Sequence, residues 1–396
     1  MAIRPEPVSV PLPSSPEEAA TRVLLVSADP KWLAAVRETT AARGGIVETV
    51  SADQAVARLA IGGTHYSHVL LDPDRAGGLL DALIDLTSGL AGTETLMLLL
   101  GSNAAARAGL GVIPRPGRRS IAAALGRQQV PARYDEPNLR LAELREAVDG
   151  AMIETRYQPI VRIADRVPAS MEVLARLNHP RHGPLMPDWF VPRFEEAGLG
   201  YDLTDRVSTI AFTDLAGPSL SETGLTIALN YPLDVLSHPD AAMQLDDKRR
   251  AAGIPSERVE IELTESRPVE DFLTLGRSLE HLRRLGYRIA IDDVGPGVQN
   301  LDTLLTMPFT ALKLDKSVVG WLETAGSAAR YARDVIAKAQ AHGLTVIAEG
   351  VEAQSTWDLL RELGVELAQG YFVARPLHPA AVPIWLNAWR AMASPA

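Results

Sequence analysis

Two adjacent carboxylates at the end of an apolar strand are the residues most suggestive of chemistry in this chain. Asp292 and Asp293 follow Ile289-Ala290-Ile291, a run typical of a strand buried on both faces. Neighbouring acids repel each other unless a cation lies beside them. A Gly-rich segment follows, and Asp and Gly are also ordinary turn residues. Alone, the pair indicates either a cation site or a plain turn.

The pattern recurs through the second half of the chain, which favours a cation site. Polar residues stand at or near the carboxyl ends of the predicted strands: Glu172, Asn230, Glu262, Asp292, Asp293, Lys313, Glu349 and Gln369. A core with this many carboxylates and no cation would be untenable. Oxygen ligands of this kind suit Mg²⁺ or Mn²⁺, including a pair of ions bridged by one carboxylate.

Two-metal sites carry out in-line displacement at phosphorus. Lys313 is suited to orient or deprotonate the attacking water, or to stabilise the charge that develops. Arg176 shares one strand face with Glu172 and is suited to grip a phosphate oxygen with its fork of donors. The residues therefore predict metal-assisted phosphodiester hydrolysis.

The elements that must position these residues predict a barrel. Strand-like runs occupy 157–161, 171–176, 225–230, 259–265, 289–293, 311–315, 344–350 and 367–372. Helical patterns occupy 188–197, 203–215, 269–285, 328–341 and 354–363. Eight strands with intervening helices over about 250 residues have the size and rhythm of a (β/α)₈ barrel, whose active sites form at the carboxyl ends of the strands.

The first part of the chain predicts a separate α/β domain. Strands near 22–27, 46–50, 68–72, 95–100 and 112–113 alternate with helical segments, as in a doubly wound parallel sheet of the flavodoxin-like kind. We expect a disordered tail at 1–20, this domain at 21–130, a Pro-containing linker at 131–139 and the barrel domain at 140–396.

Composition narrows the possible functions. The chain has 396 residues, 46% hydrophobic and 22% charged, which is typical of a globular protein. The formal net charge of -10 argues against a DNA-binding surface. Cysteine is absent, so any metal would need oxygen ligands, with or without His. No apolar stretch approaches the roughly 20 residues of a membrane span. We therefore expect a cytoplasmic protein that binds neither DNA nor membrane.

The first domain resembles a response-regulator receiver. Asp72 stands where that family has its phosphoacceptor, and Ser102 where it has its switch hydroxyl. Two positions depart from the family: Ser27-Ala28-Asp29 replaces the acidic pair that holds Mg²⁺, and Arg115 replaces a lysine. The resemblance, with these departures, implies a degenerate receiver that serves dimerisation or signalling without phosphorylation, with a sensor kinase or another signalling protein as partner. The alternative for Asp72 is a plain strand-end acid.

The second domain resembles the EAL domain family of cyclic di-GMP phosphodiesterases. The resemblance rests on motifs in family order: Gln158-Pro-Ile-Val161, Glu172-Val-Leu174, Glu262-Leu-Thr-Glu-Ser266, Asp292-Asp293, Lys313-Leu-Asp315, Ala348-Glu-Gly-Val-Glu352 and Gln369-Gly-Tyr-Phe372. It implies a TIM-like barrel, cyclic di-GMP as substrate, two Mg²⁺ or Mn²⁺ ions per site and a homodimer.

The resemblance also implies a role for each site residue. Glu172, Asn230, Glu262 and Asp292 would hold the first metal, and Asp292 with Asp293 the second. Lys313, Glu349 and Glu265 would form the catalytic group, with Lys313 at the attacking water and Glu265 anchoring the loop after Asp293. Gln158, Arg176, Asp315 and Gln369 would serve substrate binding. Plainer alternatives are a helix-start acid for Glu265 and a partner of Lys313 for Asp315.

One loop departs from the family and leaves three functions open. The segment Val294–Asn300 keeps both family glycines, Gly295 and Gly297, but lacks its aromatic and hydroxyl residues. Pro296 fixes φ and removes an N–H that could anchor the loop. The favoured hypothesis is hydrolysis of cyclic di-GMP to linear pGpG. The alternatives are a catalytically weak or inactive cyclic di-GMP sensor, and a protein-interaction module that no longer binds the nucleotide.

Overall fold

The chain forms two compact units. The computed structural model describes residues 21–61, 66–88, 96–101, 111–114, 116–126, 139–236, 240–264, 272–296, 298, 301–324 and 326–393. The first unit comprises Met1–Ala52, Gly63–Gly77 and Gly92–Gln129, and the second comprises Asp53–Gly62, Gly78–Ala91 and Val130–Ala396. The predicted tail at 1–20 and nearly all of the linker at 131–139 lie outside the described residues.

The first unit is built on a five-stranded parallel sheet with the order β2-β1-β3-β4-β5. Its strands are β1 (Arg22–Val26), β2 (Ile46–Thr49), β3 (His68–Leu71), β4 (Leu96–Leu100) and β5 (Gly111–Ile113). This order is that of flavodoxin-like folds, as the sequence predicted. Helices α1 (Pro30–Ala41) and α5 (Arg118–Leu125) share one buried cluster with side chains of this sheet, including Trp32, Leu70 and Ile121.

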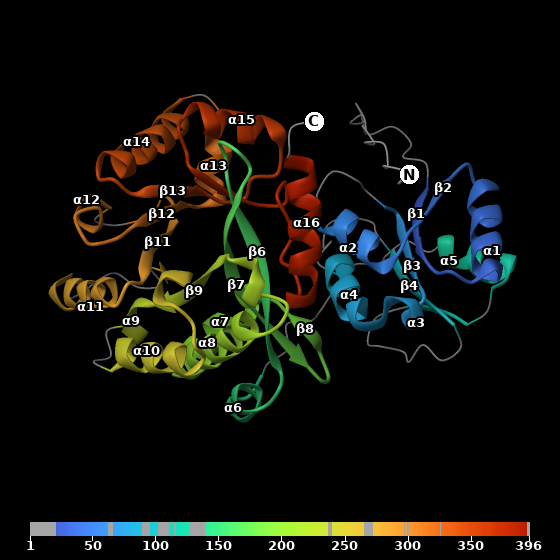
Figure 1. Ribbon diagram of the computed structural model, residues 1–396, viewed down its shortest axis with the longest axis horizontal. Coiled ribbons are helices and arrows are strands. Elements are labelled where there is room, and N and C mark those ends of the chain that lie inside the picture. Colours follow the sequence, from blue (N-terminus) through green and yellow to red (C-terminus); the bar gives the residue numbers. More distant parts are fainter. Residues whose placement is uncertain are drawn as a thin grey trace, which may run out of the picture. The chain divides into compact units, whose positions relative to one another are not determined.

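The second unit is a closed eight-stranded barrel (Figure 1). Its strands are β6 (Ile153–Arg162), β7 (Pro168–His179), β9 (Thr226–Pro232), β10 (Val259–Thr264), β11 (Arg288–Val294), β12 (Ala311–Leu314), β13 (Thr345–Ala348) and β14 (Leu367–Gln369). The short strand β8 (Gly183–Leu185) pairs antiparallel with the carboxyl-terminal end of β7. The predicted barrel is therefore confirmed.

The direction of one strand, β6, differs from the predicted (β/α)₈ pattern, in which all strands are parallel. β6 runs antiparallel to both of its neighbours, β7 and β14, whereas the other barrel pairs are parallel. The cause is the short connection between Arg162 and Pro168, because so few residues can close a hairpin but cannot make a parallel crossover. As a result, the amino-terminal end of β6 lies beside the carboxyl end of β7.

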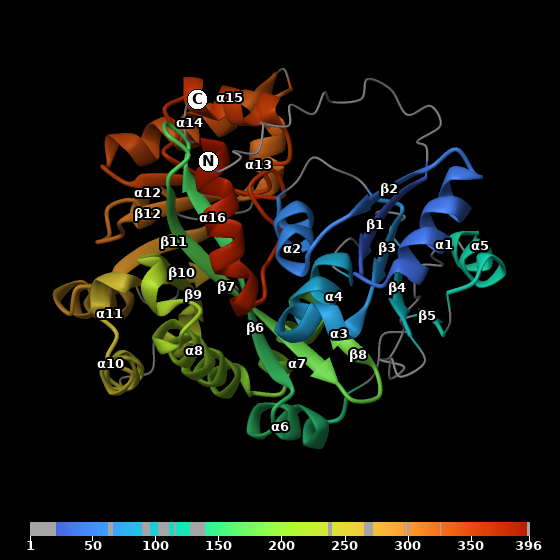
Figure 2. The same cartoon turned by 45° about the vertical axis from the view of Figure 1, so that its right-hand side comes forward.

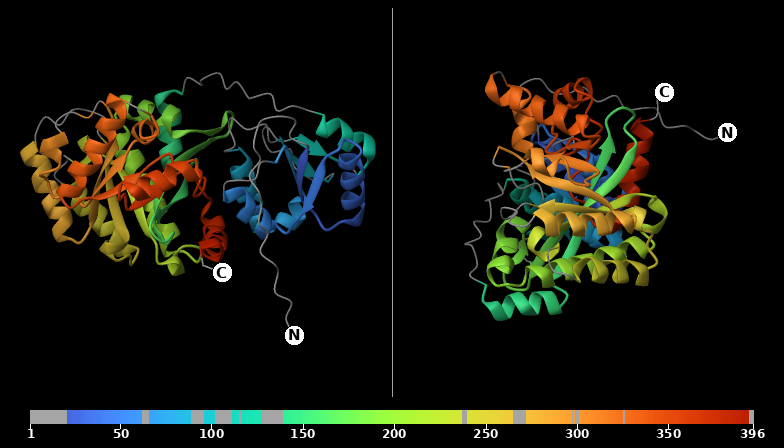
Figure 3. Two further views of the ribbon diagram at one scale, coloured as in Figure 1. Left: turned by 90° about the horizontal axis from the view of Figure 1, so that it is seen from above. Right: turned by 90° about the vertical axis from the view of Figure 1, so that its left-hand side faces the viewer.

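Helices surround the barrel strands (Figures 1 and 3). They are α6 (Leu141–Asp149), α7 (Pro187–Glu196), α8 (Gly200–Ala216), α9 (Leu233–Leu236), α10 (Ala241–Ala251), α11 (Phe272–Arg284), α12 (Leu301–Leu304), α13 (Lys316–Trp321), α14 (Ser327–Ala341), α15 (Gln354–Glu362) and α16 (Val382–Ala393). Among the described residues, no helix combines the length and the apolar character needed to cross a membrane.

Helix α16 packs beside the β6–β7 hairpin (Figure 2). Trp389 Nε1 donates to the carbonyl of Arg166 in the hairpin turn at 2.7 Å, and Trp385 Nε1 donates to the carbonyl of Val373 at 3.3 Å. Both tryptophans are buried, and their rings stack with centroids 5.8 Å apart. These contacts hold the first strand and the chain segment after β14 together.

Two helices from the first part of the chain group largely with the second unit, and the predicted domain bounds stay a prediction. Most of α2 (Ala52–Ala60) and all of α4 (Leu80–Ser88) belong to the second unit, although the sequence predicted that 21–130 forms one domain. Short helical segments α3 (Pro73–Ala76) and η1 (Gly77–Leu79) precede α4.

Candidate active site

The barrel strands bring the predicted acids together at their carboxyl ends. Two groups of carboxylates each have ligand atoms within 4.8 Å of one another: Glu172, Glu262 and Asp292 form one, and Asp292, Asp293 and Glu349 form the other. Asp292 belongs to both groups. The register explains the convergence, because Glu262 on β10 pairs with Asn230 on β9, and Gln158 on β6 pairs with Glu172 on β7.

Lys313 lies at the centre of the acids with its side chain only 1% exposed. Its Nζ lies 2.7 Å from Glu349 Oε1, 2.9 Å from Asp292 Oδ1, 3.1 Å from Glu262 Oε2 and 3.6 Å from Glu172 Oε2. Burial alone would lower the pKa of Lys313, but the four carboxylates hold this pKa well above its usual value. The side chain is therefore an ammonium ion at neutral pH.

Burial sets the protonation of the surrounding acids. It raises the pKa of Glu262 well above its usual value and also raises that of Asp292, although Lys313 opposes both shifts. Burial likewise raises the pKa of Glu349 to about 8. Glu172 differs: burial is outweighed by Lys313 and by hydrogen bonds from Asn230 and Gln369, which together lower its pKa. One lysine thus compensates only part of the acidic charge.

Amide side chains orient the carboxylate of Glu172. Asn230 Nδ2 donates to Glu172 Oε1 at 3.0 Å, and Gln369 Nε2 donates to Glu172 Oε2 at 2.6 Å. Gln369 Nε2 also lies 3.0 Å from Gln158 Oε1, while Gln158 Nε2 donates to the carbonyl of Ala374 at 3.1 Å. Gln158, Glu172 and Gln369 therefore form a buried polar network with the orientation of each side chain fixed.

The donor set fits divalent cations. Both carboxylate oxygens of Glu262 are buried and accept no hydrogen bond, although Lys313 lies within ion-pair distance. Gln369 Oε1 is also buried without a hydrogen-bond partner. Oxygen atoms in this state, converging from several strands, are the ligands that Mg²⁺ and Mn²⁺ prefer. Two carboxylate groups share Asp292, and their use as a pair of metal sites stays a prediction.

Asp293 holds an unusual backbone conformation. Its φ is +54°, and the β11–β12 register shifts between Ile291 and Val294. Asp tolerates this left-handed region better than most residues. In a regular strand, the side chains of Asp292 and Asp293 would point to opposite faces of the sheet. The bulge instead brings both carboxylates into one group of acids at the end of the barrel. Burial and the neighbouring Asp292 charge raise the pKa of Asp293 to about 6.

Two other predicted residues, Arg176 and Asp315, make their hydrogen bonds outside the cluster of acids. Arg176 Nη1 donates to the carbonyl of Ala175 at 2.8 Å. Asp315 caps α13, because its Oδ1 accepts from the Ser317 backbone N–H at 2.9 Å. The alternative prediction, that Asp315 pairs with Lys313, is wrong: among the described residues, the ion-pair partners of Lys313 are Glu172, Glu262, Asp292 and Glu349. Glu265 lies outside the described residues, as do Gln299 and Asn300 of the divergent loop.

Asp72 also makes local contacts. It caps α3 by accepting from the Asp74 backbone N–H at 3.2 Å, and Ser27 Oγ donates to its other oxygen at 3.3 Å. Asp29 caps α1 in the same way, through the Lys31 backbone N–H at 2.8 Å. The role of Asp72 as a phosphoacceptor stays a prediction. Ser102 and Arg115 lie outside the described residues.

The structure adds two charged residues that the sequence analysis did not single out. Glu154 and Arg156 precede Gln158 at two-residue intervals on β6 and so share its face of the strand. Their partners across the ladder are Arg176 and Leu174 of β7. The alternation counted from Gln158 was the signal that could have revealed them.

Loss of protons from the site is expected to destabilise the metal-free protein as the pH rises. The folded state raises the pKa of Asp293 to about 6 and that of Glu349 to about 8, above their ordinary values of 3.8 and 4.5. The folded state thus binds these protons more tightly than the unfolded chain, so the stabilisation is complete near pH 4 and is lost through pH 8. Urea unfolding in chelator should give a lower midpoint at pH 9 than at pH 5. A midpoint that rises over this window would contradict the description of the site.

Comparisons with known proteins found similar sequences over the barrel domain. A family model described as "EAL domain" matches residues 141–376. Over 254 residues the chain is 35% identical to the "Cyclic di-GMP phosphodiesterase NbdA" of Pseudomonas aeruginosa, covering 64% of this chain and 32% of that protein. Over 263 residues it is 32% identical to the "Cyclic di-GMP phosphodiesterase RocR" of the same organism, covering 63% and 64%. The chain thus spans about a third of the first relative and under two thirds of the second.

Two solved structures resemble the barrel. "EAL Enzyme Bd1971" in its "cAMP and cyclic-di-GMP bound form" has a TM-score of 0.58 at 27% identity, covering 62% of this chain and 68% of that chain. "PaMucR Phosphodiesterase, c-di-GMP complex" has a TM-score of 0.56 at 27% identity, covering 60% and 98%. Each of these two structures matches about 60% of this chain, which is about the length of the barrel domain.

Proposed function

The chain belongs to the EAL domain family, and from this premise we propose that it hydrolyses cyclic di-GMP to linear pGpG with two divalent metal ions. The observation that carries the proposal is the cluster of four carboxylates around Lys313, in which Glu262 has two buried oxygens without hydrogen bonds. Relatives at 35% and 32% identity are named as phosphodiesterases of this nucleotide, which supports the choice of substrate.

The chain offers two overlapping ligand sets for the metals. Glu172, Asn230, Glu262 and Asp292 would hold the first ion, and Asp292, Asp293 and Glu349 the second. When bound, Mg²⁺ or Mn²⁺ supplies an activated water and neutralises charge on phosphate oxygens. Gln369 and Asn230 fix both oxygens of Glu172 by hydrogen bonds, so this ligand is oriented before an ion arrives.

Lys313 and Arg176 would act on the phosphate and the attacking water. Because neighbouring carboxylates hold the pKa of Lys313 well above its usual value, it serves as a donor of hydrogen bonds and positive charge and not as a base. Arg176 would bind a phosphate oxygen from the rim, with Gln158 completing the contact to the dinucleotide. Glu265 would anchor the loop after Asp293, as the family resemblance implies.

A second candidate function is binding of cyclic di-GMP without turnover. The divergent loop favours it, because Pro296 follows the left-handed Asp293 closely and lacks a backbone N–H. The first unit would then serve as a signalling or dimerisation module, in keeping with the caps that already engage Asp29 and Asp72.

Incubation of purified protein with cyclic di-GMP and Mg²⁺ or Mn²⁺ separates these functions. We expect pGpG to accumulate and chelator to stop its formation. Calorimetric binding without any pGpG would establish the sensor instead. Absence of both turnover and binding would leave the protein-interaction module, and the proposal would fail.

A further inference from the structure

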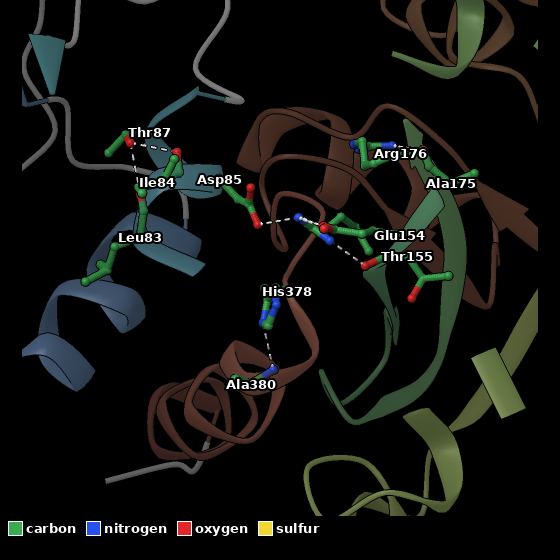
Figure 4. Close-up of polar contacts among 11 residues, drawn as sticks. Leu83, Ile84, Asp85, Thr87, Glu154, Thr155, Ala175, Arg176, His378 and Ala380 are labelled. Carbon is green, nitrogen blue, oxygen red and sulfur yellow. Dashed lines mark hydrogen bonds and ion pairs between the residues drawn. The ribbon is translucent and has the colours of Figure 1, made fainter. Parts of the chain in front are cut away.

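An ion pair joins helix α4 to the first strand of the barrel within the second unit (Figure 4). Asp85 on α4 lies with its Oδ2 2.8 Å from Arg156 Nη2 on β6. The same guanidinium lies 2.9 Å from Glu154 Oε2 and donates to the carbonyl of Thr155 at 2.8 Å. The Arg156 side chain is only 7% exposed and that of Asp85 is 28% exposed, so solvent screens this pair less than a surface pair.

The strand register places Arg156 beside the proposed dinucleotide site. Arg156 lies two residues from Gln158 on the same face of β6, and it pairs across the ladder with Leu174. Glu172 and Arg176 flank Leu174 on β7, so both are diagonal neighbours of Arg156, at about 7–8 Å between backbones. The outward face of β6 is separate, because Thr155 and Tyr157 both bond Asp214 of α8.

Charge around Arg156 opposes an anionic ligand. Asp85 and Glu154 together carry two negative charges against the single positive charge of Arg156. Cyclic di-GMP carries two phosphodiester charges and would meet this excess next to Arg176. A guanidinium occupied by two carboxylates has fewer donors left for a phosphate oxygen. These contacts therefore leave Arg156 with fewer N–H groups that are free to bind a phosphate oxygen.

We propose that α4 restrains ligand binding: Asp85 holds Arg156 away from the dinucleotide, and release of Asp85 makes Arg156 a second phosphate-binding arginine beside Arg176. The inference rests on the proposed function and adds a control element to it. In the sequence, α4 lies between β3 and β4 of the first unit's sheet, so the chain connects α4 directly to that unit.

The test compares four proteins: wild type, Asp85→Asn, Arg156→Gln and the double variant. The readouts are KM and kcat for cyclic di-GMP, with calorimetric binding alongside. Asp85→Asn should lower KM by about three- to tenfold, because one charge-assisted contact is gained. The gain should vanish in the Arg156→Gln background. As a matched control, Asp53→Asn removes an exposed carboxylate from α2, the other helix that groups with the second unit, and should leave KM unchanged.

Each outcome bears on one claim. An unchanged or higher KM for Asp85→Asn in an active protein overturns the inference and leaves the proposed function intact. An equal gain in the Arg156→Gln background also overturns it, because the effect would then be long-range electrostatics alone. Failure of both wild type and Asp85→Asn to bind or cleave the nucleotide overturns the proposed function itself. Binding by Asp85→Asn alone supports the restraint.

A pH profile gives a readout that a merely structural role would not move. Burial raises the pKa of Asp85 to about 6 although Arg156 opposes the shift. The charged groups facing it are Arg156 and Glu154 on β6, Arg176 on β7, Asp81 on α4 and His378 before η4 (Pro379–Ala381). The KM advantage of Asp85→Asn over wild type should shrink below pH 6, where Asp85 itself becomes neutral. A constant advantage from pH 5 to 8 would contradict the proposal.

Discussion

Replacing Glu172 with alanine is expected to lower the rate of cyclic di-GMP hydrolysis by about a thousandfold or more. Glu172 contributes a ligand atom to the first carboxylate group and accepts hydrogen bonds from Asn230 and Gln369. The substitution removes a metal ligand and leaves these two amides without their acceptor. Changes of ligand-supporting residues alone typically cost 10–100-fold, so loss of the ligand itself should cost more.

The measurement is pGpG formation under saturating Mn²⁺, with metal binding followed by calorimetry. Folding should survive, because one of four acids around a single lysine is removed and like-charge repulsion falls. Glu222→Ala changes an exposed glutamate just before β9 begins, at the end of that strand opposite the acids, and should leave the rate unchanged. A Glu172→Ala protein that retains its rate would show that the assignment of the metal site is wrong.

The convergence of the acids was predictable because it follows from strand direction. Parallel strands of a barrel place their carboxyl ends at one rim, so polar residues that end separate strands must meet. Glu172, Glu262, Asp292, Lys313 and Glu349 were identified in this way, and the structure brings the four carboxylates within ion-pair distance of the Lys313 ammonium. Their roles in catalysis stay predictions until activity is measured.

Features that depend on connection length and tertiary contact were less predictable. The antiparallel direction of β6 follows from a short turn whose consequence strand patterns do not report. Asp315 follows Lys313 in a family motif, yet its side chain caps a helix that the sequence did not predict. Helix α10 was not predicted either, because its run of charged residues, Asp246 to Arg250, interrupts the apolar periodicity that indicates a helix.

The contact between α4 and β6 could not be predicted from either segment alone. Asp85 and Arg156 lie far apart in the sequence. Each is a charged residue of the kind that usually lies on a protein surface. Only the folded chain shows that the pair is largely buried. Long-range ion pairs of this kind need coordinates, because periodicity reports a face and not the element that packs against it.

Replacing Lys313 with methionine is expected to destabilise the metal-free protein by about 3–5 kcal/mol at neutral pH, the usual result of removing one partner from a buried charge cluster. Methionine keeps the length and volume of the side chain, so packing changes little. Glu172, Glu262, Asp292 and Glu349 would lose the cation that lies between 2.7 and 3.6 Å from their oxygens. Urea unfolding in chelator measures the loss.

Metal ions should reverse much of this loss, and that reversal separates the site from an ordinary buried ion pair. Divalent cations that bind the folded state alone stabilise it, and they supply the positive charge that the variant lacks. Added Mn²⁺ should therefore raise the unfolding midpoint of Lys313→Met more than that of wild type. Lys338→Met is the matched control: its ammonium pairs with Asp302 at 2.9 Å in an exposed position, so its midpoint should change little and should not respond to Mn²⁺ beyond the wild-type response. An unchanged midpoint would contradict this prediction. If Lys313→Met in chelator unfolds at the wild-type midpoint, the four acids are held neutral without the lysine, and they could bind metal only after losing protons. In that case Mn²⁺ binding would be strongly pH-dependent in the variant, which the same titration at pH 6 and pH 9 would reveal.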